Sequence, residues 1–432
     1  MKKIYIETYG CTLNAADSDI MQALLKEKDY SIVDNENDSD VIVINTCTVK
    51  GATENKIMAR IKSLEKKGKK IVVAGCMSAN EKKIKKAAPL SPILGTGALK
   101  FIDSAVEAAY LGEDKVFKSN ETKDLLPKIL MAPIMRIPIN DGCTSACYFC
   151  QTKIARPYLR SYSPKTVVKW IVESVKNNAR EVQLTSMDSG AYGIDIKTNL
   201  ISLLKAISDN NSDDVQQIKD IEYYIRLGMI NPDHALRMLE DLIKIMEQNP
   251  FYKFLHVPVQ SGSEKVCREM NRDHSVEEFE KIVTKIREKI PDATISTDII
   301  VGYPTESEDD YLETVRLMQR TRPDIVNISK FSARPGTKAK ELKPLDSKIV
   351  KERSRKLNLL VKKIERENKK KYIGKIYRVL ITEKETGTHK DFKGRNINYC
   401  QVVVKDFNGK LGDFVNVKIV DANHGSLFGK II

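Results

Sequence analysis

Long apolar runs are missing from this chain of 432 residues. No run approaches the ~18 consecutive apolar residues that predict a membrane-spanning helix. The N-terminal residues MKKIYIETYG lead into a polar helical pattern, without the apolar core and small-residue cleavage site of a secretory signal. We therefore expect a cytoplasmic protein that has no membrane partner.

A fourth metal ligand is missing from the stretch INDGCTSACYFCQTK, which holds Cys143, Cys147 and Cys150. Structural zinc sites usually have four cysteine or histidine ligands, and the nearest histidine downstream is His234. The bacterial ferredoxin motif has different spacings and adds a fourth cysteine. Three thiolates can instead hold three irons of a [4Fe–4S] cluster and leave the fourth iron open, because sulfur donors suit such clusters.

A disulfide framework is not expected either. The chain has eight cysteines, and outside the triplet they are scattered. In a reducing cytosol, thiols of this kind favour metal binding or redox chemistry over disulfides. Cys267 and Cys400 match no ligand spacing, so we expect them to be ordinary core or surface thiols.

Positive charge is abundant. The chain carries 72 Lys+Arg and 58 Asp+Glu, a net charge of +14. This charge favours a polyanionic partner through counterion release, but a lysine-rich composition from an A/T-rich genome explains it equally well. The hydrophobic share of 41% is ordinary for a globular protein, and the length predicts two to four domains.

An α/β sheet domain is predicted for residues 1–112, where short apolar runs alternate with helical patterns. Strands are expected in KKIYIETYG, DVIVINTC and KKIVVAGC, and the alternation indicates a doubly wound parallel sheet. Cys11, Cys47 and Cys76 each follow one of these strands. Because the carboxyl ends of parallel strands lie along one edge, we expect the three thiols to converge. The alternative is three unrelated, buried, small side chains.

A partial parallel barrel is predicted for residues 133–345, after a charged linker at 113–132. Six strand-like runs separated by helices occur there: IMRIPIN, EVQLTS, EYYIRLG, KFLHVPV, TISTDIIVG and IVNISKFS. Six such units predict a (βα)6 barrel whose chemistry lies at the carboxyl ends of its strands. The cysteine triplet follows the first run and therefore belongs to that face.

A basic helix and a small barrel are predicted for the remaining residues. Residues 346–372 have a helical period and many lysines and arginines, which suits a bridging helix. Residues 373–432 alternate strands with Gly, Asn and Asp turns, which is typical of a small all-β barrel. A basic β-barrel is a plausible nucleic-acid module, although neither property is specific alone.

The chain resembles a known enzyme family in its motifs and in the order of its domains. A CxxxCxxC motif after the first strand of a partial barrel is the motif of radical S-adenosylmethionine (SAM) enzymes. More narrowly, the whole chain resembles the methylthiotransferases. The matching stretches are TYGCTLNAADSD, NTCTV and VAGCM in the first domain, TSMDSGAYG, FLHVPVQSGS, STDIIVGYPTE and ARPGTKA in the barrel, and FKGRNINYCQVVV, LGDFVNVKI and GSLFGKII in the last domain.

The resemblance implies two [4Fe–4S] clusters and SAM as cofactors. Cys143, Cys147 and Cys150 would hold the cluster that binds SAM and donates one electron to it, so that SAM splits into methionine and a 5′-deoxyadenosyl radical; another SAM would be the methyl donor. Three further thiols would hold an auxiliary cluster that carries the transferred sulfur: Cys11, Cys47 and Cys76. The two triplets should then face each other across a cavity large enough for a flipped-out base.

The resemblance also implies partners and a substrate. The last domain resembles the RNA-binding TRAM barrel, so tRNA is the expected partner, with a ferredoxin- or flavodoxin-like electron donor and a sulfur source. We expect the enzyme to be a monomer. The segment CYFCQTKIARPYLRSYS and the stretch TSMDSGAYG are most similar to the archaeal and eukaryotic branch. That branch adds a methylthio group to C2 of N6-threonylcarbamoyladenosine beside the anticodon.

Other functions stay open from the sequence. Other methylthiotransferases act on isopentenyladenosine in tRNA or on an aspartate of a ribosomal protein. A non-catalytic iron–sulfur protein that binds RNA is the alternative from another class. Pro157 departs from the branch, which commonly has glycine after this arginine, and proline cannot adopt a positive φ.

Polar residues in the predicted barrel are candidate cofactor or substrate ligands. Ser186, Asp188 and Ser189 follow the second strand and could bind SAM, or they could cap a helix.

Two charged residues lie inside apolar strand runs of the same barrel. Arg226 could meet the SAM carboxylate, since a charge in an apolar strand needs an anion. Asp298 could reach SAM or the substrate adenosine, and a structural pair between Arg226 and Asp298 would satisfy both. His256 is expected to be a core histidine.

Overall fold

The computed structural model describes residues 1–48, 51–123, 126, 128, 132–209, 211–384 and 391–432. These residues form two compact units, which are described separately. Unit 1 comprises Met1–Ile129, Asn140–Ser163 and Ser332–Glu341, and unit 2 comprises Leu130–Ile139, Pro164–Phe331 and Leu342–Ile432. All six cysteines of the two triplets therefore belong to unit 1, although they come from two separate segments of the chain.

Unit 1 is built on a parallel sheet with the order β2-β1-β3-β4-β5-β6. Its strands are β1 (Lys3–Thr8), β2 (Ser31–Ile32), β3 (Val41–Thr46), β4 (Ile71–Gly75), β5 (Ile93–Leu94) and β6 (Val116–Phe117). Strand β6 lies within residues 113–132, where the sequence indicated a linker, and residues 124–125, 127 and 129–131 of that range lie outside the described residues. The parallel order confirms the expected sheet.

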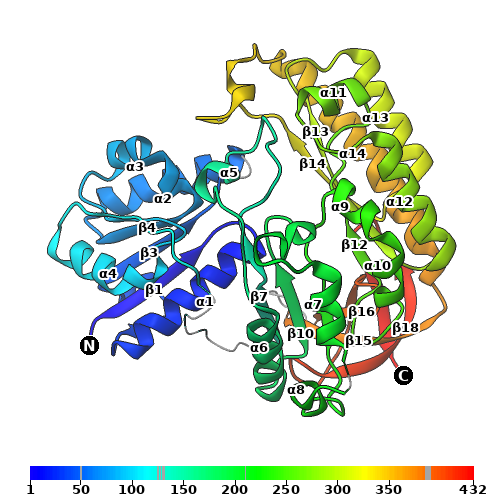
Figure 1. Cartoon of the computed structure of the whole chain (residues 1–432), viewed down its shortest axis with the longest axis horizontal. Helices are drawn as coiled ribbons and strands as arrows, with labels where there is room; N and C mark the ends of the chain where they lie inside the picture. Colours follow the sequence, from blue (N-terminus) through cyan, green and yellow to red (C-terminus); the bar gives the residue numbers. More distant parts are fainter. Residues whose placement is uncertain (49–50, 124–125, 127, 129–131, 210, 385–390) are drawn as a thin grey trace. The chain divides into compact units, whose positions relative to one another are not determined.

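Helices cover both faces of this sheet (Figure 1). Val41 and Val43 of β3 pack in one apolar cluster with α1 (Thr12–Glu27) and α4 (Ile102–Leu111). Ile42 and Ile44 point to the opposite face and pack in a second cluster with α2 (Gly51–Lys66) and α3 (Glu81–Ala87). Because alternate side chains of a strand point to opposite faces, an uninterrupted apolar run was the signal of a strand buried on both sides.

Unit 2 contains the six strands that the apolar runs predicted. They are β7 (Ile134–Pro138), β10 (Glu181–Thr185), β11 (Tyr224–Arg226), β12 (Phe254–His256), β13 (Thr294–Val301) and β14 (Ile325–Lys330). Two parallel ladders have the orders β11-β10-β7 and β12-β13-β14, and a parallel bridge between Ile225 and Phe251 connects them. This arrangement confirms the partial (βα)6 barrel.

Helices follow these strands in turn. They are α6 (Pro164–Lys176), α7 (Leu200–Ile207), α8 (Asp213–Gln216), α9 (Pro232–Arg237), α10 (Leu239–Met246), α11 (Glu264–Glu269), α12 (Val276–Lys289) and α13 (Glu308–Thr321). Two of them begin with a capping box, at Ser275 and Ser307, where the cap hydroxyl and the N3 carboxylate satisfy backbone N–H groups reciprocally. Among the described residues, no helix is both long and apolar enough to cross a membrane.

The basic helix and the small barrel complete unit 2. Helix α14 (Ser347–Lys369) packs on β14 and buries Leu357, Val361 and Ile364. The closed barrel has the order β15-β16-β17-β19-β18, from strands β15 (Ile376–Lys384), β16 (Phe392–Asn396), β17 (Gln401–Val404), β18 (Phe414–Ala422) and β19 (Leu427–Ile431). This confirms the predicted all-β barrel.

Aromatic side chains join the small barrel to the larger sheet of unit 2. The ring of Tyr399 lies 4.8 Å from that of Tyr252 and 4.7 Å from that of Phe254, measured between centroids. Lys253 donates a backbone hydrogen bond of 2.9 Å to the carbonyl of Ile397. The small barrel is therefore packed against the strands of unit 2 and is not tethered by α14 alone.

Candidate active site

The N-terminal cysteines lie at the carboxyl edge of the unit 1 sheet. Cys11 precedes α1, Cys47 follows β3, and Cys76 follows β4. In the sheet, β2 lies on one side of β1 and β3 lies on the other. The carboxyl edge at this point is therefore the switch point where open α/β sheets bind ligands. The predicted strand ends are thus adjacent.

Two glycines allow the backbone to bring these cysteines close together. Gly10 has a φ of +111°, and a Cβ there would lie 3.0 Å from Cys47 Sγ. Gly75 has a φ of +86°, and a Cβ there would lie 2.6 Å from the carbonyl oxygen of Thr46. A side chain at either position would meet both a steric and a conformational penalty.

Asn14 of α1 connects the thiols to one another. Its Nδ2 donates to the carbonyl oxygens of Tyr9 and Thr46 at 3.0 and 2.7 Å. Its Oδ1 lies 4.0 Å from Cys11 Sγ and 3.6 Å from Cys76 Sγ. The buried amide therefore fixes the helix start against β3 and faces two of the three sulfurs.

Electrostatics also indicate that the thiols are neighbours. Burial raises the pKa of Cys76 to about 12, Arg156 opposes that rise, and the thiols of Cys11 and Cys47 add to it. Thiols with such a pKa bind metals only when the metal replaces the proton. Among the described residues, no three His, Cys, Asp or Glu side chains already have the geometry of a metal site. The donor set of three thiols nevertheless has the chemistry that iron–sulfur clusters require.

The second triplet lies on a loop that a glycine turn introduces. Gly142 has a φ of +75°, and a Cβ there would lie 2.0 Å from the carbonyl oxygen of Tyr158. The backbone N–H of Ser145 points at Cys143 Sγ, 3.4 Å away. Cys143 is 9% exposed, whereas Cys147 and Cys150 are half-buried and so accessible to a small ligand.

Residues 332–341 hold this loop from another part of the chain. Tyr148 accepts a backbone hydrogen bond of 3.0 Å from Ala339, and the Lys338 ammonium lies 4.4 Å from the centre of the Tyr148 ring. Gln151 donates from Nε2 to the carbonyl of Pro335 at 3.4 Å. The stretch ARPGTKA is thus part of the same unit as the cysteines.

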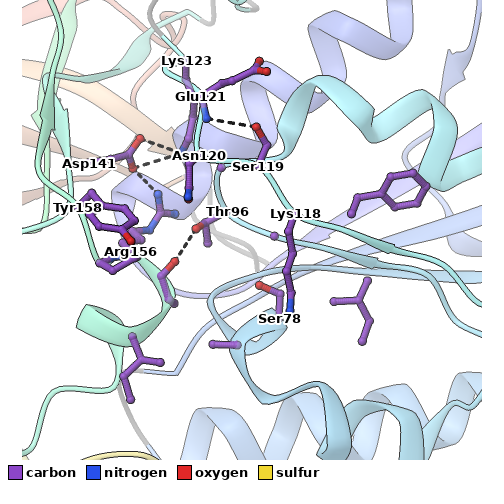
Figure 2. A pocket seen from close by; sticks show the side chains of 18 of the residues that line it. Ser78, Thr96, Lys118, Ser119, Asn120, Glu121, Lys123, Asp141, Arg156 and Tyr158 are labelled. Atoms are coloured by element: carbon purple, nitrogen blue, oxygen red, sulfur yellow. Dashed lines mark hydrogen bonds and ion pairs between the residues drawn. The ribbon is translucent and has the colours of Figure 1, made fainter.

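A buried ion-pair network connects the two triplets' segments. Arg156, 4% exposed, forms ion pairs with Asp17 of α1 and with Asp141, which lies two residues before Cys143. Lys123 lies 2.8 Å from Asp17 Oδ1 and 3.0 Å from Asp141 Oδ2. Figure 2 shows Arg156 and Lys123 converging on Asp141. The network was not predicted from the sequence.

The charges in this network balance. Burial alone would raise the pKa of Asp141, but Lys123 and Arg156 outweigh burial and lower it. Arg156 keeps its charge because the two carboxylates raise its pKa despite burial. Two cations and two anions therefore neutralise one another beside Cys76. Polar residues on the buried face of α1, such as Asn14 and Asp17, were the available sequence signal.

A second buried arginine, Arg334, lies beside the start of α2, the helix that follows Cys47. Arg334 is 6% exposed and donates from Nη1 to Glu54 of α2, which also pairs with Lys83. Burial lowers the pKa of Arg334, whereas Glu54 and the Cys47 thiol raise it. Arg334 Nη2 has no hydrogen-bond partner within the described part of the chain.

A cavity of about 310 Å³ opens beside the ion-pair network (Figure 2). Loops after β4, β5 and β6 line it, together with residues of the segment 154–160. Thr96 Oγ1 donates to the carbonyl of Ala155 at 2.7 Å across one side. None of the six cysteines lines this cavity, so the expected base-sized cavity between the triplets stays a prediction.

The turn after β10 uses its polar residues for local structure. Asp188 is fully buried and accepts hydrogen bonds from the backbone N–H of Gly190 at 3.0 Å and from Asn231 Nδ2 at 2.8 Å. Ser186 and Ser189 share a hydrogen bond of 3.0 Å. Asp188 is thus a cap, as the alternative interpretation expected, and the SAM contacts of the three residues stay predictions.

The contacts that the structure describes for Arg226 and for Asp298 involve different residues. The Arg226 guanidinium lies 5.3 Å from the centre of the Phe254 ring and 5.6 Å from that of Tyr399. Asp298 lies 3.1 Å from His256 Nε2 and accepts from Asn327 Nδ2 at 2.8 Å. His256 is therefore part of a polar row across β12, β13 and β14, and the cofactor roles of Arg226 and Asp298 stay predictions.

The two remaining cysteines are core thiols. Cys267 lies 3.5 Å from the carbonyl oxygen of Ser261, and Cys400 lies 3.5 Å from Thr294 Oγ1. Both are buried, as expected for thiols without ligand spacing.

Three protein-family models match consecutive parts of the chain. They are the uncharacterized protein family UPF0004 at residues 3–95, the radical SAM superfamily at residues 137–318 and the TRAM domain at residues 370–432. The order agrees with the domain order inferred from the motifs.

Curated relatives are similar over the full length. A probable threonylcarbamoyladenosine tRNA methylthiotransferase of Pyrococcus horikoshii is 40% identical, covering 100% of both chains. The threonylcarbamoyladenosine tRNA methylthiotransferase of Drosophila melanogaster is 35% identical over 100% of this chain and 78% of its own. That of Homo sapiens is 35% identical over 100% of this chain and 74% of its own.

Solved structures share the fold at low sequence identity. The radical SAM methyltransferase TsrM of Kitasatospora setae, with cobalamin and a [4Fe–4S] cluster bound, has a TM-score of 0.55 at 11% identity, covering 78% of this chain and 77% of its own. The cobalamin-dependent radical SAM enzyme OxsB has a TM-score of 0.53 at 10% identity, covering 84% and 56%.

Proposed function

Because the chain belongs to the threonylcarbamoyladenosine tRNA methylthiotransferases, a radical SAM family that uses [4Fe–4S] clusters, we propose that it adds a methylthio group to C2 of N6-threonylcarbamoyladenosine beside the anticodon of tRNA. The product is 2-methylthio-N6-threonylcarbamoyladenosine. The relatives give no support to isopentenyladenosine, to a ribosomal-protein aspartate or to a non-catalytic role.

The observation that best supports this proposal is the placement of both triplets in unit 1. A radical generator alone needs only Cys143, Cys147 and Cys150. A second set of three thiols, joined to that loop through Arg156, is what sulfur transfer requires in addition. Each set consists of three thiols, and the sequence has no fourth cysteine at a ligand spacing beside either set.

We assign the two clusters to the two triplets. Cys143, Cys147 and Cys150 would hold the SAM-binding cluster, and Cys11, Cys47 and Cys76 the auxiliary cluster. When bound, these groups supply the electron, radical and sulfur chemistry that the unactivated C2–H bond of adenine demands. The chain's own part is to orient them: Asn14 faces two of the auxiliary thiols, and the Ser145 N–H supports Cys143.

Residues of unit 2 are proposed to bind SAM and substrate. Of the three candidates in this turn, Ser186 is half-buried and the other two are buried, so its hydroxyl is the most accessible, while Asp188 and Ser189 hold the turn in shape. Arg226, whose Nε is buried without a hydrogen-bond partner among the described residues, suits an anionic group. Asp298, held by His256 and Asn327, is the proposed contact to the substrate.

The C-terminal barrel, the protein partners and the domain limits complete the proposal. The basic C-terminal barrel is proposed to contact the tRNA backbone. We propose a cytoplasmic monomer that receives electrons from a ferredoxin- or flavodoxin-like donor and sulfur from a separate source. The domain limits proposed are 1–112, 133–345 and 373–432, with 113–132 and 346–372 as connecting segments.

Nucleoside mass spectrometry of tRNA tests the function directly. We expect a host that lacks this activity to gain 2-methylthio-N6-threonylcarbamoyladenosine when it expresses the chain. Cys147→Ala should abolish the product, since the SAM-binding cluster loses a ligand, whereas Cys267→Ala, which removes a core thiol, should retain it.

Two outcomes would contradict the proposal. A product that carries the methylthio group on another nucleoside would show that the substrate is wrong. A purified, iron-loaded chain that never cleaves SAM under a low-potential reductant would favour the non-catalytic alternative.

A further inference from the structure

Arg334 places a buried donor, without an acceptor in the described part of the chain, beside Gly51, the first residue of the helix that follows Cys47. The residue is 6% exposed, and its Nη1 is engaged by Glu54. Its Nη2 has no hydrogen-bond partner among the residues that the structure describes. A buried N–H of a charged group that lacks an acceptor costs free energy, so its surroundings normally provide one.

Glu54, the carboxylate next to Arg334, already has two ion-pair partners. Glu54 accepts from both Arg334 and Lys83 and is 4% exposed. The packing is close, because a Cβ at Gly51 would lie 2.8 Å from Ser332 Oγ and 3.9 Å from Arg334 Nη2. The Cys47 thiol, four residues before Gly51, is near enough for its anionic form to attract the guanidinium and raise the pKa of Arg334.

Arg334 differs in this respect from Arg156. The charge of Arg156 is matched by Asp17 and Asp141, and Lys123 completes a neutral set. Arg334 and Lys83 share the single carboxylate of Glu54, which leaves an excess of one positive charge. Arg156 therefore links two segments of the chain. Arg334 instead has an N–H group without an acceptor among the described residues and a positive charge without a carboxylate of its own.

Sulfur is the acceptor that this position would meet. Cysteine thiolates and the sulfides of a cluster carry negative charge, and hydrogen bonds to these sulfurs set the potential of a cluster. A donor that strengthens as the cluster gains an electron stabilises the reduced form. The spare Nη2, near the start of the helix that follows Cys47, has the right chemistry for this role.

We propose that Arg334 donates from Nη2 to a sulfur atom of the cluster held by Cys11, Cys47 and Cys76 and so raises the reduction potential of that cluster. This inference rests on the proposed function, which places an auxiliary cluster at this triplet. It assigns a role to a residue of the stretch ARPGTKA that lies 280 positions after its ion-pair partner Glu54 in the sequence.

A potentiometric titration of the full chain tests the inference. Replacing Cys143, Cys147 and Cys150 together by alanine leaves one cluster, whose one-electron reduction is followed by electron paramagnetic resonance. In this background we expect Arg334→Gln to lower the equilibrium constant for reduction at least about tenfold, which is about 59 mV for a one-electron couple. Arg334→Lys keeps the charge but loses the fork, and a smaller decrease is expected.

Two control variants separate this effect from general damage. Glu54→Gln removes the negative neighbour and should shift the potential in the opposite direction, upward. Lys118→Gln removes a positive charge from a side chain of unit 1 that is 70% exposed, and solvent screening should leave the potential unchanged. If Arg334→Gln fails to load iron, the potentials of Arg334→Lys and Glu54→Gln still show whether the positive charge of Arg334 raises the reduction potential.

The outcomes distinguish this inference from the function on which it rests. A background chain that binds no iron would overturn both. An iron-loaded chain whose potential does not respond to Arg334→Gln, or responds in the same direction to Glu54→Gln, would overturn the role of Arg334 and leave the cluster assignment standing.

Discussion

At the residue scale, glycines determine where three of the cysteines can lie. Gly10, Gly75 and Gly142 each directly precede a cysteine of a triplet, and each has a positive φ. At each position a Cβ would lie 3.0 Å or less from a neighbouring atom. The need for glycine is therefore twofold: conformational freedom and close approach of another segment.

Gly142→Ala and Gly112→Ala separate these two causes. Both glycines have a φ of +75°, but a Cβ at Gly112 would meet nothing within 4 Å, whereas one at Gly142 would lie 2.0 Å from the Tyr158 carbonyl. We expect Gly112→Ala to lower the free energy of unfolding by about 1 kcal/mol, with normal iron content. Gly142→Ala should lower it further and reduce iron bound by the second triplet, as measured by urea unfolding and iron analysis. Equal effects of the two variants would show that the close contact is unimportant.

At the element scale, the apolar pattern of each segment explains most of the fold. Strand β3 is buried along its whole length, and a run such as VIVINT can fill only a strand covered on both faces. The six barrel strands were recognisable as short apolar runs separated by helical patterns, although β14, for example, is only partly buried. Short strands such as β5 and β6, of two residues each, carry too little pattern to be predicted.

Helix α14 offers a test of packing at this scale. Leu357 is fully buried, and Leu359, two residues later on the same helix, is 59% exposed. Leu357→Ala should lower the free energy of unfolding by about 2–5 kcal/mol, because it removes buried methyl groups and leaves a cavity. Leu359→Ala should change it by less than about 0.5 kcal/mol. Similar values in urea unfolding would mean that α14 does not pack as described.

Contacts between distant segments could not be predicted from local pattern. Arg156 pairs with Asp17 across 139 positions, and Arg334 pairs with Glu54 across 280. Each residue in isolation reads as an ordinary surface charge, because no period or spacing marks its partner. The six cysteines were easier to recognise, since three share one short loop and three follow predicted strands.

At the scale of the whole molecule, the net charge of +14 becomes relevant to tRNA binding. Lys418 and Lys430 are exposed neighbours across β18 and β19 of the C-terminal barrel. We expect replacement of both by alanine to weaken tRNA binding and to reduce the slope of log affinity against log salt by up to ~1.8, since each phosphate contact contributes ~0.7–0.9. Filter binding over a salt series measures both quantities.

A matched double variant checks that this effect is local. Lys281 and Lys285 of α12 pair with Glu277 and Glu240, so their charges are partly compensated. Their replacement by alanine should leave the slope unchanged. An unchanged slope after loss of Lys418 and Lys430 would place the RNA contacts elsewhere on the chain.

Unit 1 is assembled from residues 1–129, 140–163 and 332–341, and this has a consequence for synthesis on the ribosome. A nascent chain that ends before residue 156 buries Asp17 without its guanidinium partner, and one that ends before residue 334 leaves Glu54 without Arg334. The N-terminal sheet can form early, but its cysteine edge is complete only after about three-quarters of the chain has been translated. Cluster insertion into the first triplet should therefore be a late event, close to release of the chain.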